Sequence, residues 1–377
     1  MVERRAVLLV PGFGNFVRNE RRDMLVGSLA LNDPMPVSAP EDAVIAGAAG
    51  RRLRPIAAQA GERPVVDIFE IYWADLLPKS ELASPLARFW KASGLLLYWV
   101  AHPWWLGAIR ANRSLTLSLL AIMALVFLWY LTVFLALLTF LASTDAGAAI
   151  KAELGGDGIL GQWIGSVTHW LRPLASGTID WLGMVPAVLL LGIGLLRVEA
   201  IVGLTDFARL YLRSGRNRGY QADLAQRVQE MLEQVHAART PDGADAAYDE
   251  IVLLGHSMGG AIALEALANY GNPAIKARTV LITWGSPLAI LAYRNPARVR
   301  ANIKRAAESA VPRWIDYYSP DDGLSTEIRE LRRAGRTPSQ KLSFPTAWWQ
   351  GVSVEAHNQY YFDDATLSTL LAREMPV

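Results

Sequence analysis

The sequence predicts an α/β protein whose mostly parallel β-sheet has helices on both faces, with an inserted two-helix transmembrane hairpin. Three observations support this prediction. Short β-branched apolar runs alternate with amphipathic segments, as in strands joined by crossover helices. A glycine-rich turn lies between one such run and a helical segment. Two long apolar segments interrupt this pattern, and 377 residues suffice for one large domain with an insertion.

The first part of the α/β domain is predicted over residues 1–78. Its first strand covers residues 6–10 and ends at Pro11-Gly12-Phe13-Gly14. This apolar run is too short for the hydrophobic region of a signal peptide, so it reads as a buried strand. A second strand is expected over residues 65–73.

Residues 79–205 are predicted to form a membrane insertion with two spans. Residues 115–142 are almost wholly apolar, and at about 1.5 Å per residue this helix exceeds the roughly 30 Å hydrocarbon core of a bilayer. The second span, residues 177–197, contains one proline and several glycines. For this second segment, a buried or re-entrant helix is the alternative.

The distribution of cations predicts the orientation of these spans. Arginine and lysine residues precede the first span and follow the second, whereas the loop 143–176 between them carries only Lys151 and Arg172. An excess of cations marks the cytoplasmic side, so the loop is expected to be external. The protein is therefore predicted to be a multi-pass protein of the bacterial inner membrane, with its α/β domain in the cytoplasm.

Residues 89–109 form a third unusual segment before the first span. They contain four tryptophans, and aromatic side chains with a polar edge favour the headgroup level of a bilayer. We expect an interfacial helix on the cytoplasmic leaflet. The alternative is a core helix in a cap of the α/β domain.

The second part of the α/β domain is predicted over residues 206–377. Apolar residues recur on one face of a helix at 220–237. The remaining predicted elements follow in chain order: strands at 251–254, 279–284 and 314–318, and a closing helix at 364–373.

The residues Gly255-His256-Ser257-Met258-Gly259-Gly260 lie between the strand at 251–254 and a helix predicted at 261–270, with Gly271 as its C-cap. A serine on such a tight turn is pushed out of the sheet, so that its hydroxyl is exposed beside backbone N–H groups. Small residues are needed because the strand and the helix approach closely. We interpret the turn as a nucleophile elbow around Ser257; the alternative is a structural Gly/Ser turn.

A serine nucleophile requires a base, an orienting carboxylate and oxyanion donors. His357 is the only histidine after Ser257, and it is expected in a loop before the last helix, where it could reach the serine. His256 has no role in this scheme. The backbone N–H groups of Met258 and Phe13 are the candidate oxyanion donors. Alternatively, the glycines beside Phe13 only form the turn that ends the strand.

The orienting acid is expected in Ser319-Pro320-Asp321-Asp322-Gly323-Leu324-Ser325, which follows the strand at 314–318. Asp322 is favoured over Asp321 because it precedes Gly-Leu and can turn inward; alternatively, both are turn or cap residues. Asp363 and Asp364 come after His357 and break the expected order of serine, acid and histidine.

The composition excludes several other kinds of site. The chain has no cysteine, which rules out disulfides and thiol catalysis, and its five histidines lack the paired spacing of a zinc site. No metal and no cofactor is expected. The formal charge of +2 implies no nucleic-acid partner, whereas 13 tryptophans and a positive mean hydropathy indicate contact with lipid.

Several of these motifs together resemble the α/β-hydrolase superfamily, particularly its bacterial lipase- or esterase-like members. The resemblance is carried by the turn at 10–14, the elbow at 255–260, Trp284-Gly285-Ser286-Pro287-Leu288, and the positions of Asp322 and His357. It covers roughly residues 1–78 and 206–377. It implies a Ser257 nucleophile, a His357 base and an Asp322 acid, whereas the membrane insertion departs from the soluble members.

The leading hypothesis is a membrane-anchored serine hydrolase that cleaves acyl esters through an acyl-enzyme, with an acyl ester or lipid-like substrate. An acyltransferase with the same triad and a non-catalytic membrane scaffold are the alternatives. The acyl chain, the headgroup, the oligomeric state and the role of the insertion as lid or anchor stay open at this stage.

Overall fold

The computed structural model describes residues 3–14, 16–31, 36–56, 63–77, 198–213, 219–240, 245–311, 313–344 and 354–375, together with positions 94, 95, 98, 106, 107 and 124. The chain divides into two compact units, one formed by Met1–Ser118 and Leu204–Val377 and the other by Leu119–Gly203.

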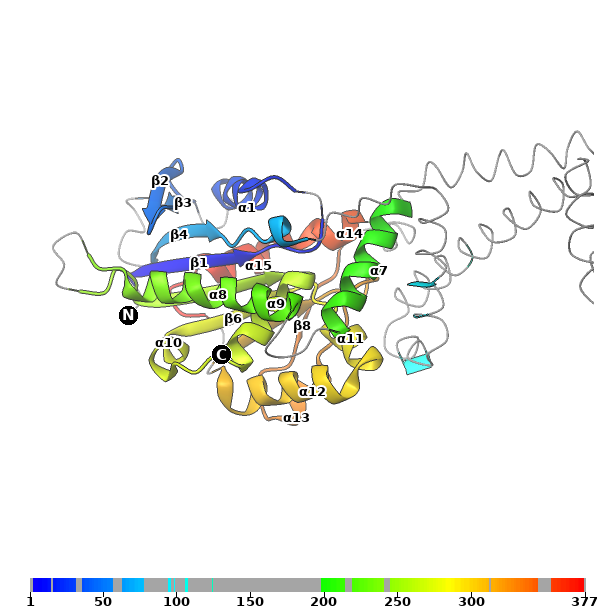
Figure 1. Cartoon of the computed structure of the whole chain (residues 1–377). Coiled ribbons are helices and arrows are strands. Elements are labelled where there is room, and N and C mark those ends of the chain that lie inside the picture. Colours follow the sequence, from blue (N-terminus) through cyan, green and yellow to red (C-terminus); the bar gives the residue numbers. More distant parts are fainter. Residues whose placement is uncertain are drawn as a thin grey trace, which may run out of the picture. The chain divides into compact units, whose positions relative to one another are not determined.

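A single eight-stranded sheet forms the centre of the first unit, in the order β2-β3-β4-β1-β5-β6-β7-β8 (Figure 1). The strands are β1 (Arg4–Val10), β2 (Glu41–Ile45), β3 (Ala48–Leu53), β4 (Val65–Glu70), β5 (Glu250–His256), β6 (Thr279–Trp284), β7 (Arg313–Tyr318) and β8 (Gln340–Lys341). All strands from β4 to β8 pair in parallel, and only the β2–β3–β4 edge is antiparallel. The predicted fold class, a mostly parallel α/β sheet with flanking helices, is confirmed.

Helices connect the strands and cover the sheet. The α-helices are α1 (Glu20–Ala30), α7 (Val198–Arg213), α8 (Tyr220–Ala237), α9 (Met258–Ala268), α10 (Pro273–Ala277), α11 (Leu288–Arg294), α12 (Pro296–Arg305), α13 (Arg329–Arg333), α14 (Val354–Asn358) and α15 (Asp364–Leu371). Short turns of other helix types are η2 (Ala74–Leu76), η3 (Ala306–Ala310) and η5 (Gln359–Tyr361).

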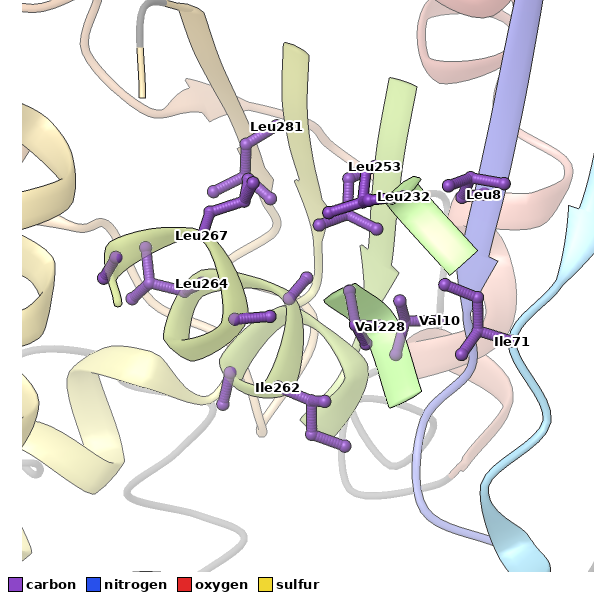
Figure 2. Close-up of a cluster of buried hydrophobic side chains, with 14 of the residues drawn as sticks. Leu8, Val10, Ile71, Val228, Leu232, Leu253, Ile262, Leu264, Leu267 and Leu281 are labelled. Carbon is purple, nitrogen blue, oxygen red and sulfur yellow. The ribbon is translucent and has the colours of Figure 1, made fainter. Parts of the chain in front are cut away.

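The core has two halves because successive residues of a strand point to opposite faces of the sheet. In β1, the side chains of Leu8 and Val10 pack with α8 and α9, whereas Val7 and Leu9 pack on the opposite face with α1 and α15. Figure 2 shows the first of these clusters, which joins β1, β5 and β6 to the two helices. Burial on both faces explains why the central strands are almost continuously apolar.

The β2–β3 hairpin and α1 were not predicted from the sequence. The hairpin mixes small apolar residues with charged ones, and a charged contact accompanies its backbone pairing with β4: the Arg52 guanidinium donates to both carboxylate oxygens of Asp67 at 2.7 and 2.6 Å. The first turn of α1 is held in a similar way by a residue distant in sequence. The carboxylate of Glu70 accepts the backbone N–H groups of Asn19, Arg21 and Arg22.

Most predicted elements appear close to the expected positions, and three bounds are corrected. The strand predicted over 65–73 ends at Glu70, whose carboxylate binds the start of α1. The helix after the elbow begins at Met258 rather than at residue 261. It ends at Ala268, so Gly271 is not its C-cap. The Asn269 side chain ends this helix, donating to the carbonyl of Glu265 at 3.0 Å.

The predicted span 177–197 and the loop 143–176 lie outside the described residues, as do most of the interfacial segment 89–109 and all of the span 115–142 except position 124. Within the described part of the chain, no helix has the length and apolar character needed to cross a bilayer.

Candidate active site

Ser257 lies at a sharp turn between β5 and α9. It is the only residue between the last residue of the strand, His256, and the first of the helix, Met258. Its backbone has φ 56° and ψ −128°, a conformation that residues with a side chain rarely adopt. Such strain costs about 1–3 kcal/mol and persists only where the surroundings enforce it. Here the backbone N–H of Ser257 donates to the carbonyl of Trp284 in the neighbouring strand at 2.9 Å.

The glycines around this turn are required by space. A Cβ on Gly259 would overlap the carbonyl oxygen of Val10, and a Cβ on Gly255 would lie 2.5 Å from the Cα of Gly260. Both obstacles are backbone atoms, which cannot rotate away. The backbone of β1 therefore lies directly against the backbone at the start of α9, with no room for a side chain between them, as expected for a nucleophile elbow.

The loop after β1 packs directly against this serine. A Cβ on Gly12 would lie 2.6 Å from the Cβ of Ser257 and 3.2 Å from its hydroxyl oxygen. The same loop is fixed on its other side, because Trp73 Nε1 donates to the carbonyl of Pro11 at 2.9 Å. The ring of Phe13 stacks on Phe207 of α7 with a centroid distance of 5.2 Å.

The backbone N–H groups of Phe13 and Met258, the two candidate oxyanion donors, make no hydrogen bond to another described residue. For Met258 this follows from its position, since the first N–H groups of a helix have no partner within the helix. Both groups belong to segments that contact Ser257, so they are available to a negative charge that develops near its hydroxyl.

Asp322 and His357 form a buried pair. His357 Nδ1 lies 2.8 Å from Asp322 Oδ2, and both side chains are almost fully buried. Asp322 also accepts the backbone N–H of Leu324 at 2.9 Å and the hydroxyl of Tyr360 at 3.1 Å. Three donors thus converge on one carboxylate, which compensates for its removal from water.

Asp321 faces a different group, although it is adjacent in sequence. Its Oδ2 accepts the backbone N–H of Phe344 at 3.0 Å and the hydroxyl of Ser319 at 3.4 Å. Asp321 thus fastens two loop segments to each other, and it is Asp322 that faces the imidazole. Asp363, further along the chain, caps the N-terminus of α15 by accepting the N–H groups of Ala365 and Thr366.

His357 was expected in a loop, and this expectation is wrong, since it lies in the short helix α14. The reason is local packing. Ala356 and Tyr360 are one helical turn apart, and both are fully buried, so the apolar face of the segment favours a helical conformation over an open loop.

His256, the residue before Ser257, contacts the segment that carries His357. His256 Nε2 lies 2.9 Å from the carbonyl oxygen of His357, and the two imidazole rings are 4.8 Å apart between centroids. His357 Nε2 is buried and has no hydrogen-bond partner among the described residues. The Ser257 hydroxyl does not bond to it in this conformation, and such bonds are often long before substrate binds.

The sequence did not reveal the roles of two contributors to the site. Tyr360 binds Asp322, the backbone of Ser319 and the hydroxyl of Ser325. Its only sequence cue is its position three residues after His357 on the same helical face. The second contributor, Gly285, has φ 56°, and a Cβ there would collide with the ring of Tyr360.

No three His, Asp or Glu side chains within the described ranges lie close enough to hold a metal ion.

A family model described as the alpha/beta hydrolase family matches residues 161–374, more than half of the chain. The chain belongs to the α/β hydrolase family. Members of this family are generally hydrolytic enzymes. Comparison with curated proteins and with solved structures gives no match.

The matched range differs in two ways from the range over which the motifs resemble the family. It begins at residue 161 and so omits β1 and β4, although both strands belong to the same sheet as β5. It also takes in residues 161–205, which the sequence analysis assigned to the membrane insertion.

Proposed function

We propose that this α/β hydrolase is a serine hydrolase that cleaves acyl esters, with Ser257 as nucleophile, His357 as base and Asp322 as orienting acid. The observation that carries the proposal is the buried Asp322–His357 pair, which lies against the residue that precedes Ser257. Ser257 itself occupies the strained turn that a nucleophile elbow requires.

The proposed reaction passes through an acyl-enzyme. Ser257 Oγ attacks the carbonyl carbon of the ester while His357 Nε2 takes the hydroxyl proton. The N–H groups of Phe13 and Met258 donate to the oxyanion that forms. His357 then gives its proton to the leaving alcohol, and the ester C–O bond breaks. Water, activated by the same imidazole, attacks the acyl-enzyme and releases the carboxylic acid.

Asp322 orients the base throughout this cycle. A carboxylate can only accept, so its bond to Nδ1 keeps the proton on that nitrogen and leaves Nε2 free to receive the serine proton. The negative charge also stabilises the imidazolium that forms in the transition state.

The experiment that tests this proposal is labelling by a fluorophosphonate probe, which reacts with activated serines. The wild-type protein should be labelled, Ser257→Ala should abolish labelling, and His357→Ala should weaken it strongly. Ser28→Ala is the matched control, because Ser28 lies on α1 and, among the described residues, its hydroxyl donates to the carbonyl of Met24 alone. Folded wild-type protein that does not react would instead favour a non-catalytic scaffold.

The labelling experiment does not separate hydrolysis from acyl transfer, because the same three residues serve both reactions. Product analysis with a simple acyl ester, in the presence and absence of an added alcohol, separates them. Free carboxylic acid as the main product in both cases supports hydrolysis, and a new ester that forms in the presence of the alcohol supports transfer.

We further propose that the enzyme is anchored in a bacterial inner membrane by residues 115–142 and 177–197, so that a lipid-like ester reaches the site from the bilayer. This part is supported by the sequence alone, through the apolar character of both segments and the flanking cations. The absence of cysteine allows a direct test, since each introduced thiol is unique. On intact cells, an impermeant thiol reagent should modify Asp157→Cys and spare Asn217→Cys; equal reaction contradicts this orientation.

A further inference from the structure

His256 is a buried histidine that the proposed reaction does not use. It is the last residue of β5, directly before Ser257, and its side chain is only 4% exposed. Its Nε2 atom lies 2.9 Å from the backbone carbonyl oxygen of His357. A single side chain therefore connects the segment that carries the nucleophile with the segment that carries the base, 101 residues further along the chain.

The partner of Nε2 determines the protonation state of this ring. A carbonyl oxygen accepts hydrogen bonds and cannot donate, so Nε2 must carry a proton. Burial, followed by the nearby His357, lowers the pKa of His256 well below its ordinary value of 6.5. The hydrogen bond to the His357 carbonyl raises the pKa and so offsets part of this effect, and Arg21 lowers the pKa further. The ring is thus neutral, with a proton on Nε2 and a lone pair on Nδ1.

Packing on three sides fixes the position of the ring. Its centroid is 4.8 Å from that of His357 and 4.8 Å from that of Tyr361, which it meets at an interplanar angle of 63°. On the third side, Nδ1 faces the loop after β1, since a Cβ on Gly12 would lie 3.3 Å from it. The elbow, the base and the candidate oxyanion loop therefore meet at His256.

We propose that His256 is a positioning residue, which holds the backbone of His357 while Asp322 holds its ring. This inference rests on the proposed function. Two fixed points on one residue limit both the translation and the rotation of the imidazole, and a misplacement of about 1 Å can cost 100-fold in rate. A neutral neighbour also does not oppose the positive charge that His357 gains during the reaction.

The test compares two variants. His256→Leu removes the N–H donor and keeps a side chain of similar volume. In His256→Gln, the side-chain amide N–H can reach the carbonyl of His357 as the imidazole does. The rate constant for fluorophosphonate labelling is measured from pH 5 to 9, and the reactive fraction of each sample is determined by labelling to completion. His256→Leu should label about 10- to 100-fold more slowly. The apparent pKa of its pH–rate profile should fall, because a His357 ring that is less firmly positioned is less well stabilised as a cation by Asp322. His256→Gln should recover most of the rate.

A matched control is His236→Leu on α8, whose ring contacts Arg278 and none of these groups, and it should label like the wild type. A merely structural role for His256 would lower the reactive fraction in His256→Leu while the rate constant and pH profile of the remaining protein stay unchanged, and this result overturns the proposal. A wild type that does not label contradicts the proposed function itself.

A second measurement is made on the wild-type protein, and the variant His256→Gln serves only to assign the signal. Nitrogen NMR of the histidine rings in the wild-type protein should show one neutral imidazole protonated on Nε2 that does not titrate between pH 6 and 8, and this signal should be lost in His256→Gln. A ring at position 256 that is protonated on Nδ1 in its neutral form contradicts the proposed bond.

Discussion

The two halves of the candidate site are constructed in different ways. The elbow is formed by one contiguous stretch, in which β5 leads through Ser257 into α9, and its shape follows from steric contacts between backbone atoms. The acid–base half joins Asp322, after β7, to His357, in α14, through hydrogen bonds between residues 35 positions apart. Local sterics leave a pattern in the sequence, whereas a hydrogen bond between distant residues leaves almost none.

The neighbouring carboxylates Asp316 and Asp322 show the same contrast on a smaller scale. Both are buried, but Asp322 accepts from three donors around its loop, whereas Asp316 lies within β7, where the hydroxyl of Thr283 donates to it at 2.5 Å. Burial raises the pKa of Asp316 to about 6. The two carboxylates thus differ in their donors: an imidazole, a backbone N–H and a phenol donate to Asp322, whereas the side chains of Thr283 and Ser339 bind Asp316.

The largest expected effect tests the acid–base half. Asp322→Asn should lower kcat for a simple ester about 10,000-fold, or about 5.5 kcal/mol in activation free energy, because the amide cannot keep the imidazole in its working tautomer. The fold, checked by circular dichroism, should be retained. Asp321→Asn is the matched control, since Asp321 bonds to the backbone of Phe344, and it should lose less than about tenfold. Equal losses in the two variants would contradict the assignment.

The next effect tests the elbow by its steric demand. In Gly259→Ala the new methyl group overlaps the backbone of Val10, so unfolding free energy should fall by about 3 kcal/mol or more, measured by denaturant titration. Gly271→Ala serves as the control, because no heavy atom lies within 4 Å of its Cβ position, and its stability should change by less than about 1 kcal/mol. A stable Gly259→Ala protein would mean that β1 and α9 are less closely packed than described.

The smallest effect concerns the pH dependence of stability through Asp316. Its pKa in the folded state, about 6, lies above the ordinary value in the unfolded chain, so the fold favours the protonated acid. The resulting stabilisation is complete below about pH 4 and is lost as the pH rises through 6. Asp316→Asn removes this titration. Relative to wild type, the variant should therefore gain about 1–3 kcal/mol in unfolding free energy between pH 4 and 7.

Thermal or denaturant unfolding of both proteins at several pH values measures this difference. A constant difference across the whole range would show that Asp316 does not titrate in the folded protein. Because Asp316 belongs to the strand that leads to Asp322, the result measures the free energy of ionising a carboxyl group that is buried within the sheet rather than in the loop.

The elements that the sequence predicted well are those whose signal is local. The helix α8 has the predicted bounds because its apolar face repeats over its whole length, and the strand β6 does so because both its faces are buried. The β2–β3 hairpin was missed because it is held by contacts such as that between Arg52 and Asp67, which no local pattern reveals. The helical conformation of His357 was missed because it depends on two buried side chains one turn apart.

By itself, the sequence determined the α/β class and the elbow around Ser257, since hydrophobic periodicity and the steric need for glycine operate over a few neighbouring residues. It also limited the candidates for the orienting acid to two adjacent residues, Asp321 and Asp322. Only the tertiary structure decided that Asp322 faces His357, that Tyr360 donates to Asp322, and that His256 lies against the backbone carbonyl of His357. These contacts are directional, and they join groups that become neighbours only when the sheet and its helices have assembled.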